Sequence, residues 1–328
     1  MAAVQGILSQ AEEVIEARPE YYLYAIAAHV DDSQRTWGLD ATGVVDCPFT
    51  GKGIKVAILD TGVDRRHPDF AGRTIVEKLF VDASSLTDVV GHGTHCAGTA
   101  VGPRSPGVVA PGYGCAPDAE LYVGKVLNDA GFAEEGSVAE GIEWATEQGC
   151  HVISLSLGRE VRPGEKPTPF YERLGKTALD MGCLIVAASG NNSERTSGSI
   201  APVSEPANSP SIMAVGAVDP TLRIAFFSNG AVNPAGGSLD IVAPGTSVFS
   251  SFIAPKDYEI LMGTSMACPH VAGVAALWAE SDPALRGQAL WDALVASAKP
   301  IGLPKRDGGA GLVQAPTKGA GMARVPTV

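Results

Sequence analysis

The stretch Lys55-Val56-Ala57-Ile58-Leu59-Asp60-Thr61-Gly62 decides the fold class of this chain. It is a short, mostly apolar run that ends on a carboxylate and is followed by a glycine turn, the pattern of a buried strand. Five similar runs, most of them rich in branched residues, lie at residues 121–127, 152–157, 184–188, 212–218 and 239–242. The sequence therefore predicts six buried strands.

Helical patterns lie between several of these runs. Apolar residues recur at helical spacing over 137–148 and 170–181, and residues 265–280 form a long apolar stretch with many small side chains. Strands that alternate with helices of this length favour an α/β fold with a mainly parallel central sheet and helices on both faces. Weaker patterns predict a helix over 11–17 and a strand over 21–28.

Length and charge limit the classes of protein to which this chain can belong. The 328 residues suffice for one large domain, and we expect an N-terminal extension over 1–34, a domain over 35–315 and a tail over 316–328. The formal net charge of −12 argues against nucleic acid or an anionic membrane as a partner. The sequence shows no signal peptide and no run of transmembrane length. As given, it predicts a cytoplasmic protein, or a secreted one if a leader lies outside it.

The cysteines show no paired spacing. Most lie in apolar or glycine-rich segments, as buried thiols do, and we expect all of them to be reduced. Cys150 and Cys183 each follow a glycine and open a predicted strand, so a bridge between them is the alternative. The six cysteines are Cys47, Cys96, Cys115, Cys150, Cys183 and Cys268.

Three segments carry the residue types that nucleophilic attack on a carbonyl requires. DTGVD at 60–64 places Asp60 at the carboxyl end of a predicted strand, and GHGTHCAG at 91–98 places His92 at the start of a small-residue helix. GTSMACPH at 263–270 places Ser265 where a glycine-led turn enters a helix, whose dipole favours developing negative charge. A hydroxyl, an imidazole that takes its proton and a carboxylate that orients the imidazole form a catalytic triad.

Two other interpretations of these segments are weaker. GTSMA resembles the nucleophile elbow of lipases, but no Asp and then His follow it in the order which that fold needs. His92, His95 and Cys96 could suggest a zinc site, but their spacing lacks the intervening glutamate of the zinc-protease motif. We therefore expect no metal at these residues, and we expect His95 and Cys96 to be packing residues.

The three segments resemble the three signature blocks of the subtilisin-like (subtilase) serine protease family, in the same chain order. The likeness runs from about residue 37 to residue 315 and includes VISLSLG at 152–158, AASGN at 187–191, APG at 243–245 and GAGLV at 309–313. It implies a subtilisin-like fold and a serine endopeptidase of broad specificity that forms an acyl-enzyme on Ser265. It also implies peptide or protein substrates and no cofactor for the chemistry, and we expect a monomer.

The family pattern assigns a role to each matching residue of this sequence. Asp60 would orient His92, His92 would act as general base and then acid, and Ser265 would attack the substrate. Asn191 and the Ser265 backbone N–H would hold the oxyanion. The substrate would enter the cleft as an added strand. The resemblance assigns substrate binding to Ser156, Leu157, Gly158, Gly131, Ala133 and Gly190.

A structural calcium site is where this sequence departs from the family pattern. Many subtilases hold a calcium ion with an Asp shortly after the catalytic strand and an Asn-bearing loop after the His helix. Asp69 matches the first element, but residues 101–111 contain no Asn, Asp or Glu. Those side chains supply the oxygens that Ca²⁺ prefers. The sequence therefore leaves the site open, with Asp69 as its candidate ligand.

Two other functions remain open on the same residues. An inactive subtilase fold could serve as a binding module, although such a protein is expected to lose one of the four catalytic residues, and all are present. A peptide ligase or cyclase would use the same acyl-enzyme, so the sequence does not separate hydrolysis from transfer. On specificity, Glu134 and Glu135 favour basic residues upstream of the cut. Glu205 would favour one at the cut itself if its carboxylate pointed inward.

Overall fold

The computed structural model describes residues 29–317, except for residue 84 and residues 106–109. In these residues, seven strands form one sheet in which every neighbouring pair is parallel. Across the sheet they are Ile75–Leu79 (β2), Glu120–Lys125 (β3), Lys55–Asp60 (β1), Val152–Leu155 (β4), Leu184–Ala188 (β5), Met213–Val218 (β6) and Ile241–Pro244 (β7). The predicted parallel α/β sheet is confirmed.

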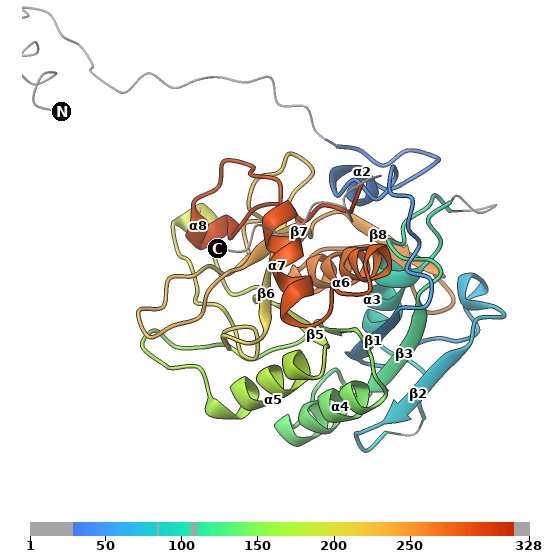
Figure 1. The fold of residues 1–328 in the computed structure, drawn as a ribbon, viewed down its shortest axis with the longest axis horizontal. Helices are drawn as coiled ribbons and strands as arrows, with labels where there is room; N and C mark the ends of the chain where they lie inside the picture. Colours follow the sequence, from blue (N-terminus) through green and yellow to red (C-terminus); the bar gives the residue numbers. More distant parts are fainter. Residues whose placement is uncertain (1–28, 84, 106–109, 318–328) are drawn as a thin grey trace, which may run out of the picture.

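Helices cover both faces of this sheet (Figure 1). One face carries α3 (His92–Val101), α6 (Thr264–Ser281) and α7 (Gln288–Ser297), and the other carries α4 (Glu135–Glu147) and α5 (Pro169–Asp180). Alternate strand residues serve the two sides, as the period of a strand requires. Val56 and Ile58 pack in the core with α3 and α6, whereas Ala57 and Leu59 pack in the core with α4 and α5.

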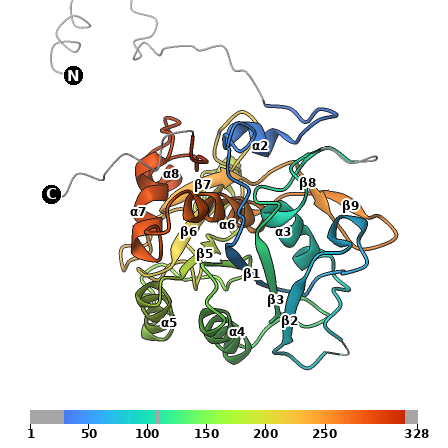
Figure 2. The same cartoon turned by 45° about the vertical axis from the view of Figure 1, so that its right-hand side comes forward.

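The remaining elements lie around this sandwich, and Figure 2 shows the β8 and β9 ribbon beside α3. That ribbon is antiparallel. The elements are α2 (Trp37–Ala41), α8 (Lys305–Gly308), β8 (Val248–Ser251), β9 (Tyr258–Leu261) and two 3-10 helices at Pro68–Phe70 and Arg195–Ser197.

Close packing of α6 fixes the position of the Ser265 segment. This helix is buried along most of its length and packs against β4, β5, β6 and β7. At Gly273 it approaches α3 so closely that a Cβ atom would lie 2.6 Å from the Ala100 carbonyl oxygen and 2.5 Å from Cys115 Cβ. A larger residue would push α6 away from the sheet and move Ser265 with it.

The predicted elements match the structure apart from their ends. All six predicted strands and all three long helices are present, with boundaries that differ by one or two residues. The sequence missed β2, an edge strand that carries Glu77 and Lys78, and it missed the short β8 and β9 ribbon. Charged residues are common on edge strands and weaken the apolar pattern. The predicted elements at 11–17 and 21–28 lie outside the described residues, and the proposed boundaries at 34 and 315 stay predictions.

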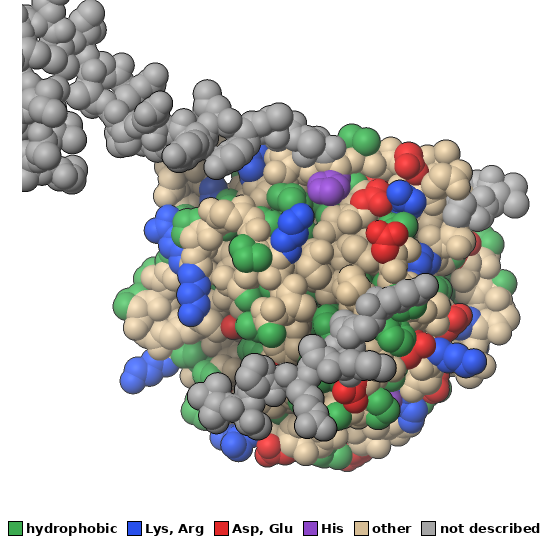
Figure 3. Space-filling model, turned by 45° about the horizontal axis from the view of Figure 1, so that its top comes forward, with side chains coloured by type: hydrophobic (Ala, Val, Ile, Leu, Met, Phe, Trp, Pro, Cys, Tyr) green, Lys and Arg blue, Asp and Glu red, His purple; other side chains and the backbone are tan. Residues whose placement is uncertain are grey.

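All six cysteines are buried and free, so the alternative of a Cys150–Cys183 bridge is wrong. Among the described helices, none combines the length and the hydropathy that crossing a membrane requires. On the face shown in Figure 3, lysine and arginine side chains lie singly or in small groups among acidic and uncharged ones.

Candidate active site

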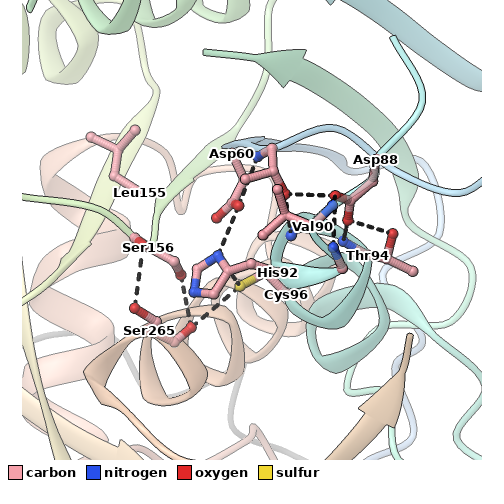
Figure 4. A network of polar contacts seen from close by, with 12 residues as sticks. Asp60, Asp88, Val90, His92, Thr94, Cys96, Leu155, Ser156 and Ser265 are labelled. Carbon is pink, nitrogen blue, oxygen red and sulfur yellow. Dashed lines mark hydrogen bonds and ion pairs between the residues drawn. The ribbon is translucent and has the colours of Figure 1, made fainter. Parts of the chain in front are cut away.

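The three segments singled out in the sequence meet at the carboxyl edge of the sheet. Asp60 is the last residue of β1, His92 is the first residue of α3, and Ser265 is the second residue of α6. Figure 4 shows the His92 imidazole between the Asp60 carboxylate and Ser265. The fold thus brings together three side chains that lie up to 205 residues apart in the sequence.

The Asp60 carboxylate orients the His92 ring. His92 Nδ1 lies 2.8 Å from Asp60 Oδ1, which also accepts a bond of 2.7 Å from the Thr61 N–H. Asp60 is fully buried, whereas the His92 side chain is 28% exposed. Because a carboxylate can only accept, Nδ1 carries the proton, and Nε2 is left with a free lone pair. His92 therefore has the tautomer that a general base needs.

The charge of Asp60 also sets the proton affinity of His92. Burial of the ring lowers its pKa, but the adjacent carboxylate outweighs this effect and holds the pKa well above the usual 6.5. Cys96 lies near the same ring nitrogen, with Sγ 4.0 Å from His92 Nδ1. Burial raises the pKa of the Cys96 thiol, so it stays protonated and adds no charge at neutral pH.

The structure does not bring together the three residues of the weaker zinc interpretation. His95 points toward the β8 and β9 ribbon, where its Nε2 lies 3.0 Å from the Val248 carbonyl oxygen. Burial lowers the pKa of His95 to about 4, so it is a neutral packing residue. Asp60, His92 and Cys96 do place one ligand atom each within 4.8 Å of one another. His92 Nδ1 and Asp60 Oδ1, however, already share a hydrogen bond.

Two reciprocal hydrogen bonds attach Ser265 to the end of β4. The Ser265 hydroxyl donates to the Ser156 carbonyl oxygen at 3.2 Å, and the Ser156 hydroxyl donates to the Ser265 carbonyl oxygen at 2.8 Å (Figure 4). As the second residue of α6, Ser265 has a backbone N–H for which the helix itself provides no acceptor. This N–H is therefore a ready donor to an anion.

Asn191 supplies a second donor at the same place. Its Oδ1 accepts from both the backbone N–H and the hydroxyl of Thr264, each at 2.9 Å. Since an N–H can only donate, the amide oxygen must face Thr264, and the amide nitrogen remains as the donor on the cavity side. Gly190 makes this turn with φ of 104°, and a Cβ there would lie 2.2 Å from Ser204 Oγ. Glycine is required at this position.

Two cavities flank the wall formed by residues 156–158. The larger, of about 530 Å³, runs from His92 to the rim at residues 131–135. The smaller, of about 300 Å³, adjoins Ser265 and Asn191. Leu157 and Gly158 line both cavities. The predicted substrate-binding residues are distributed between them: Ser156, Gly131 and Ala133 line the larger, and Gly190 lines the smaller.

The condition placed on Glu205, that its carboxylate faces a residue at the cut, is not met. Its carboxylate is buried and accepts from Arg159 Nε at 2.5 Å and from Thr168 Oγ1 at 2.6 Å. The charge is therefore taken up by a guanidinium and is not presented to a residue at the cut. No sequence pattern marks Arg159 as the partner, because the two residues lie 46 positions apart.

Asp69 does not fit a calcium ion. Its Oδ2 accepts from the Tyr113 hydroxyl at 2.7 Å and from the Tyr258 hydroxyl at 3.0 Å. Burial and the neighbouring carboxylate raise the pKa of both tyrosines, so both keep their protons. In the described part of the following loop, Arg104 donates to the carbonyl oxygens of Cys47 and Cys115. Asp69 thus already accepts from two tyrosine hydroxyls, and Arg104 brings a positive charge into the described part of the loop from which further oxygen ligands would have to come.

Sequence reasoning also missed a buried carboxylate next to the triad. Asp88 accepts from the hydroxyls of Thr61 and Thr94 and from backbone N–H groups at the start of α3. Its position, four residues before His92, is a weak signal by itself, because carboxylates are common in loops. Glu160, which lines the smaller cavity, was missed as well.

Comparisons with known proteins agree with this geometry. The model of the "Subtilase family" matches residues 51–319. "M-protease" of Shouchella clausii (strain KSM-K16) is 44% identical over 252 residues, which cover 75% of this chain and 60% of that protein. "Subtilisin Savinase" of Lederbergia lenta is 43% identical, with 75% of this chain and 85% of that protein covered.

The fold has a close counterpart among solved structures. The structure described as "a cold adapted subtilisin-like serine proteinase" superposes with a TM-score of 0.66 at 29% identity, covering 82% of this chain and 89% of that one. Family model, sequence relatives and fold all agree. The chain belongs to the subtilase family.

Proposed function

We propose that this chain is a serine endopeptidase that hydrolyses peptide bonds through an acyl-enzyme on Ser265. The observation that carries the proposal is the 2.8 Å contact between Asp60 and His92, with Ser265 and the Asn191 amide beside it. This is the set of groups that acyl transfer to a hydroxyl requires. The names of the relatives, a protease and a subtilisin, support the same activity.

Each group would have one task in the reaction. The Ser265 hydroxyl turns from the Ser156 carbonyl toward His92 Nε2, loses its proton to this nitrogen and attacks the substrate carbonyl. The Ser265 N–H and the Asn191 amide hold the oxyanion that forms. His92 then passes its proton to the leaving amine as the peptide bond breaks. A water molecule, activated by His92 in the same way, releases the acyl group from Ser265.

Substrate would bind mainly through its backbone. The wall at residues 156–158 continues β4 beyond its last ladder pair and faces the rim at 131–133 across the larger cavity. An extended peptide can add there as a strand, which reads main chain before side chains and favours broad specificity. Gly158 suits this close approach, because a Cβ there would already meet the Glu205 carbonyl oxygen at 2.6 Å.

The rim of the larger cavity would bias the cleavage toward basic residues upstream of the cut. Glu134 and Glu135 are exposed and line this cavity. An exposed charge contributes about 1 kcal/mol or less, so we expect a preference of a few-fold that salt weakens. A peptide library cleaved at low ionic strength should show basic enrichment, and Glu134→Gln with Glu135→Gln should remove it. A library without such enrichment would leave both glutamates as ordinary surface charges.

Casein digestion by the purified protein tests the activity itself. Ser265→Ala should lose turnover, because it removes the hydroxyl that attacks the substrate carbonyl. Asn191→Ala should keep the fold and lower kcat by about 10² to 10³, a range taken from subtilisin itself. An active Ser265→Ala variant would contradict the assignment. Product analysis with an added amine separates hydrolysis from ligation, and a folded protein that cleaves nothing would favour a binding module.

A further inference from the structure

We propose that Glu160 makes the cavity beside Ser265 selective for lysine or arginine at the residue whose carbonyl is attacked. The proposal rests on the proposed function, since it assumes that Ser265 is the nucleophile. It concerns the smaller cavity, of about 300 Å³, whose lining includes Ser265, Asn191 and Glu160. Neither the sequence pattern nor the family resemblance pointed to Glu160.

The geometry of the reaction decides which side chain enters this cavity. The substrate carbonyl carbon must reach Ser265 Oγ while its oxygen lies at the Asn191 amide and the Ser265 N–H. The side chain of that residue is attached to the carbon atom next to the carbonyl carbon. The cavity that contains both Ser265 and Asn191 is the space open to it, between the walls at residues 157–158 and 188–192.

Glu160 is the one ionisable side chain among the residues that line this cavity. The residue is exposed, and within the described part of the chain its carboxylate forms no ion pair. The remaining lining is apolar or neutral, with Leu157 and Ala188 as the apolar part and Asn192 and Ser204 as the polar part. A long side chain can lay its methylene groups on the apolar part and bring a cationic end to Glu160.

The neighbouring arginine does not cancel this charge. Arg159 and Glu205 form an antiparallel bridge, and consecutive residues of an extended segment point to opposite sides. Arg159 accordingly lines the larger cavity, while Glu160 lines the smaller one. The Arg159 guanidinium already pairs with Glu205 at 2.5 Å and with Glu165 at 2.7 Å. Two other carboxylates thus share the Arg159 guanidinium.

The expected effect is moderate because Glu160 is exposed. A pair of this kind contributes about 1 kcal/mol, which corresponds to about a five-fold change in rate constant. A glutamate at the cut would be disfavoured by like-charge repulsion. Salt should reduce both effects, since it screens exposed charges.

The test measures kcat/KM for matched peptides that differ only at the residue before the cut, which is lysine, leucine or glutamate. The wild-type protein should prefer lysine over leucine. Glu160→Gln should lower the lysine to leucine ratio about five-fold. Glu160→Lys should invert the order of the lysine and glutamate peptides. Glu140→Gln, at an exposed residue of α4 that lines none of these cavities, is the matched control and should change no ratio.

The outcomes separate this proposal from the proposed function. If Glu160→Gln leaves the lysine to leucine ratio unchanged while all peptides are cleaved, only the proposed role of Glu160 is overturned. If Glu140→Gln lowers the lysine to leucine ratio as much as Glu160→Gln does, the role of Glu160 is also overturned, because the effect then comes from the net charge of the protein. If the wild-type protein cleaves none of the peptides or casein, the proposed function fails and the assignment fails with it.

Discussion

Thr61 and Asp88 are joined by a hydrogen bond of 2.9 Å from the threonine hydroxyl to Asp88 Oδ1. Thr61 follows Asp60 directly, and its hydroxyl also accepts from the Gly93 N–H at 2.9 Å. The bond therefore ties the end of β1 to the start of the His92 helix. The same carboxylate accepts four further bonds, from Val90 N, Gly91 N, Thr94 N and Thr94 Oγ1. One buried residue thus fixes the position of Asp60 relative to His92.

We predict that Asp88→Asn lowers kcat by about 10- to 100-fold while KM changes little. An amide cannot accept at both of its atoms, so some of the buried donors lose their partner and the His92 helix shifts relative to Asp60. The free energy of unfolding should fall by at least about 1–3 kcal/mol. Steady-state kinetics and urea denaturation measure the two effects.

Asp82→Asn provides the control for Asp88, because Asp82 is an exposed residue of the same loop. This change should affect neither quantity. If Asp88→Asn lowers stability but leaves kcat as in the wild type, Asp88 is a structural residue without a role in positioning the triad.

The pH dependence of kcat/KM should report the raised pKa of His92. Only the neutral imidazole can take the Ser265 proton, so activity is lost as the pH falls through the His92 pKa. Asp60 holds this pKa above 6.5, and the loss should therefore begin above pH 6.5. Cys96→Ala should not change the pH at which kcat/KM falls, because the thiol is neutral. A loss of activity that begins only at or below pH 6.5 would show that Asp60 does not stabilise the imidazolium.

Mercurials should inhibit through Cys96. Its sulfur lies 3.4 Å from the Ser265 carbonyl oxygen and 4.0 Å from His92 Nδ1, so a metal on the thiol would displace both residues. Cys268 is also buried, 3.4 Å from Ser154 Oγ, and burial raises its pKa to about 12. Both thiols should react slowly. Residual activity after mercurial treatment, with mass spectrometry to count the modified thiols, measures this.

Single variants separate the two cysteines. Cys96→Ala should make the protein resistant, and Cys268→Ala should leave it sensitive. Full activity in a protein whose Cys96 and Cys268 are both shown to be modified would mean that the packing around the triad tolerates the added groups.

Chelation of calcium should change the melting temperature by no more than a few degrees, because Asp69 is held by two tyrosine hydroxyls. Tyr113→Phe or Tyr258→Phe should each lower the free energy of unfolding by about 1.5–3 kcal/mol, the value of a hydrogen bond to a charged group. Tyr122→Phe is the control, since its ring packs against Trp144 on the other face of the sheet. A fall of tens of degrees with chelator would point to calcium sites elsewhere.

The sequence by itself determined the fold class and the residues of the triad. Buried strands and the helices between them leave local periodic patterns, and each pattern is complete within a few residues. The chemistry is local too, because Asp60, His92 and Ser265 each lie in a glycine-containing segment of recognisable form. Asn191 was predicted from the family resemblance, on the segment AASGN at 187–191.

Only the tertiary structure decided how the other charged residues are used. The sequence pointed to Glu205 and not to Glu160, yet Arg159 pairs with Glu205, whereas Glu160 lines the cavity beside Ser265. Asp69 matches a calcium ligand in sequence, but a tyrosine 189 residues away occupies it. The charge that a carboxylate presents depends on which donors reach it. Those donors come from distant segments, so only the packing of strands and helices decides which of them lie within hydrogen-bonding distance.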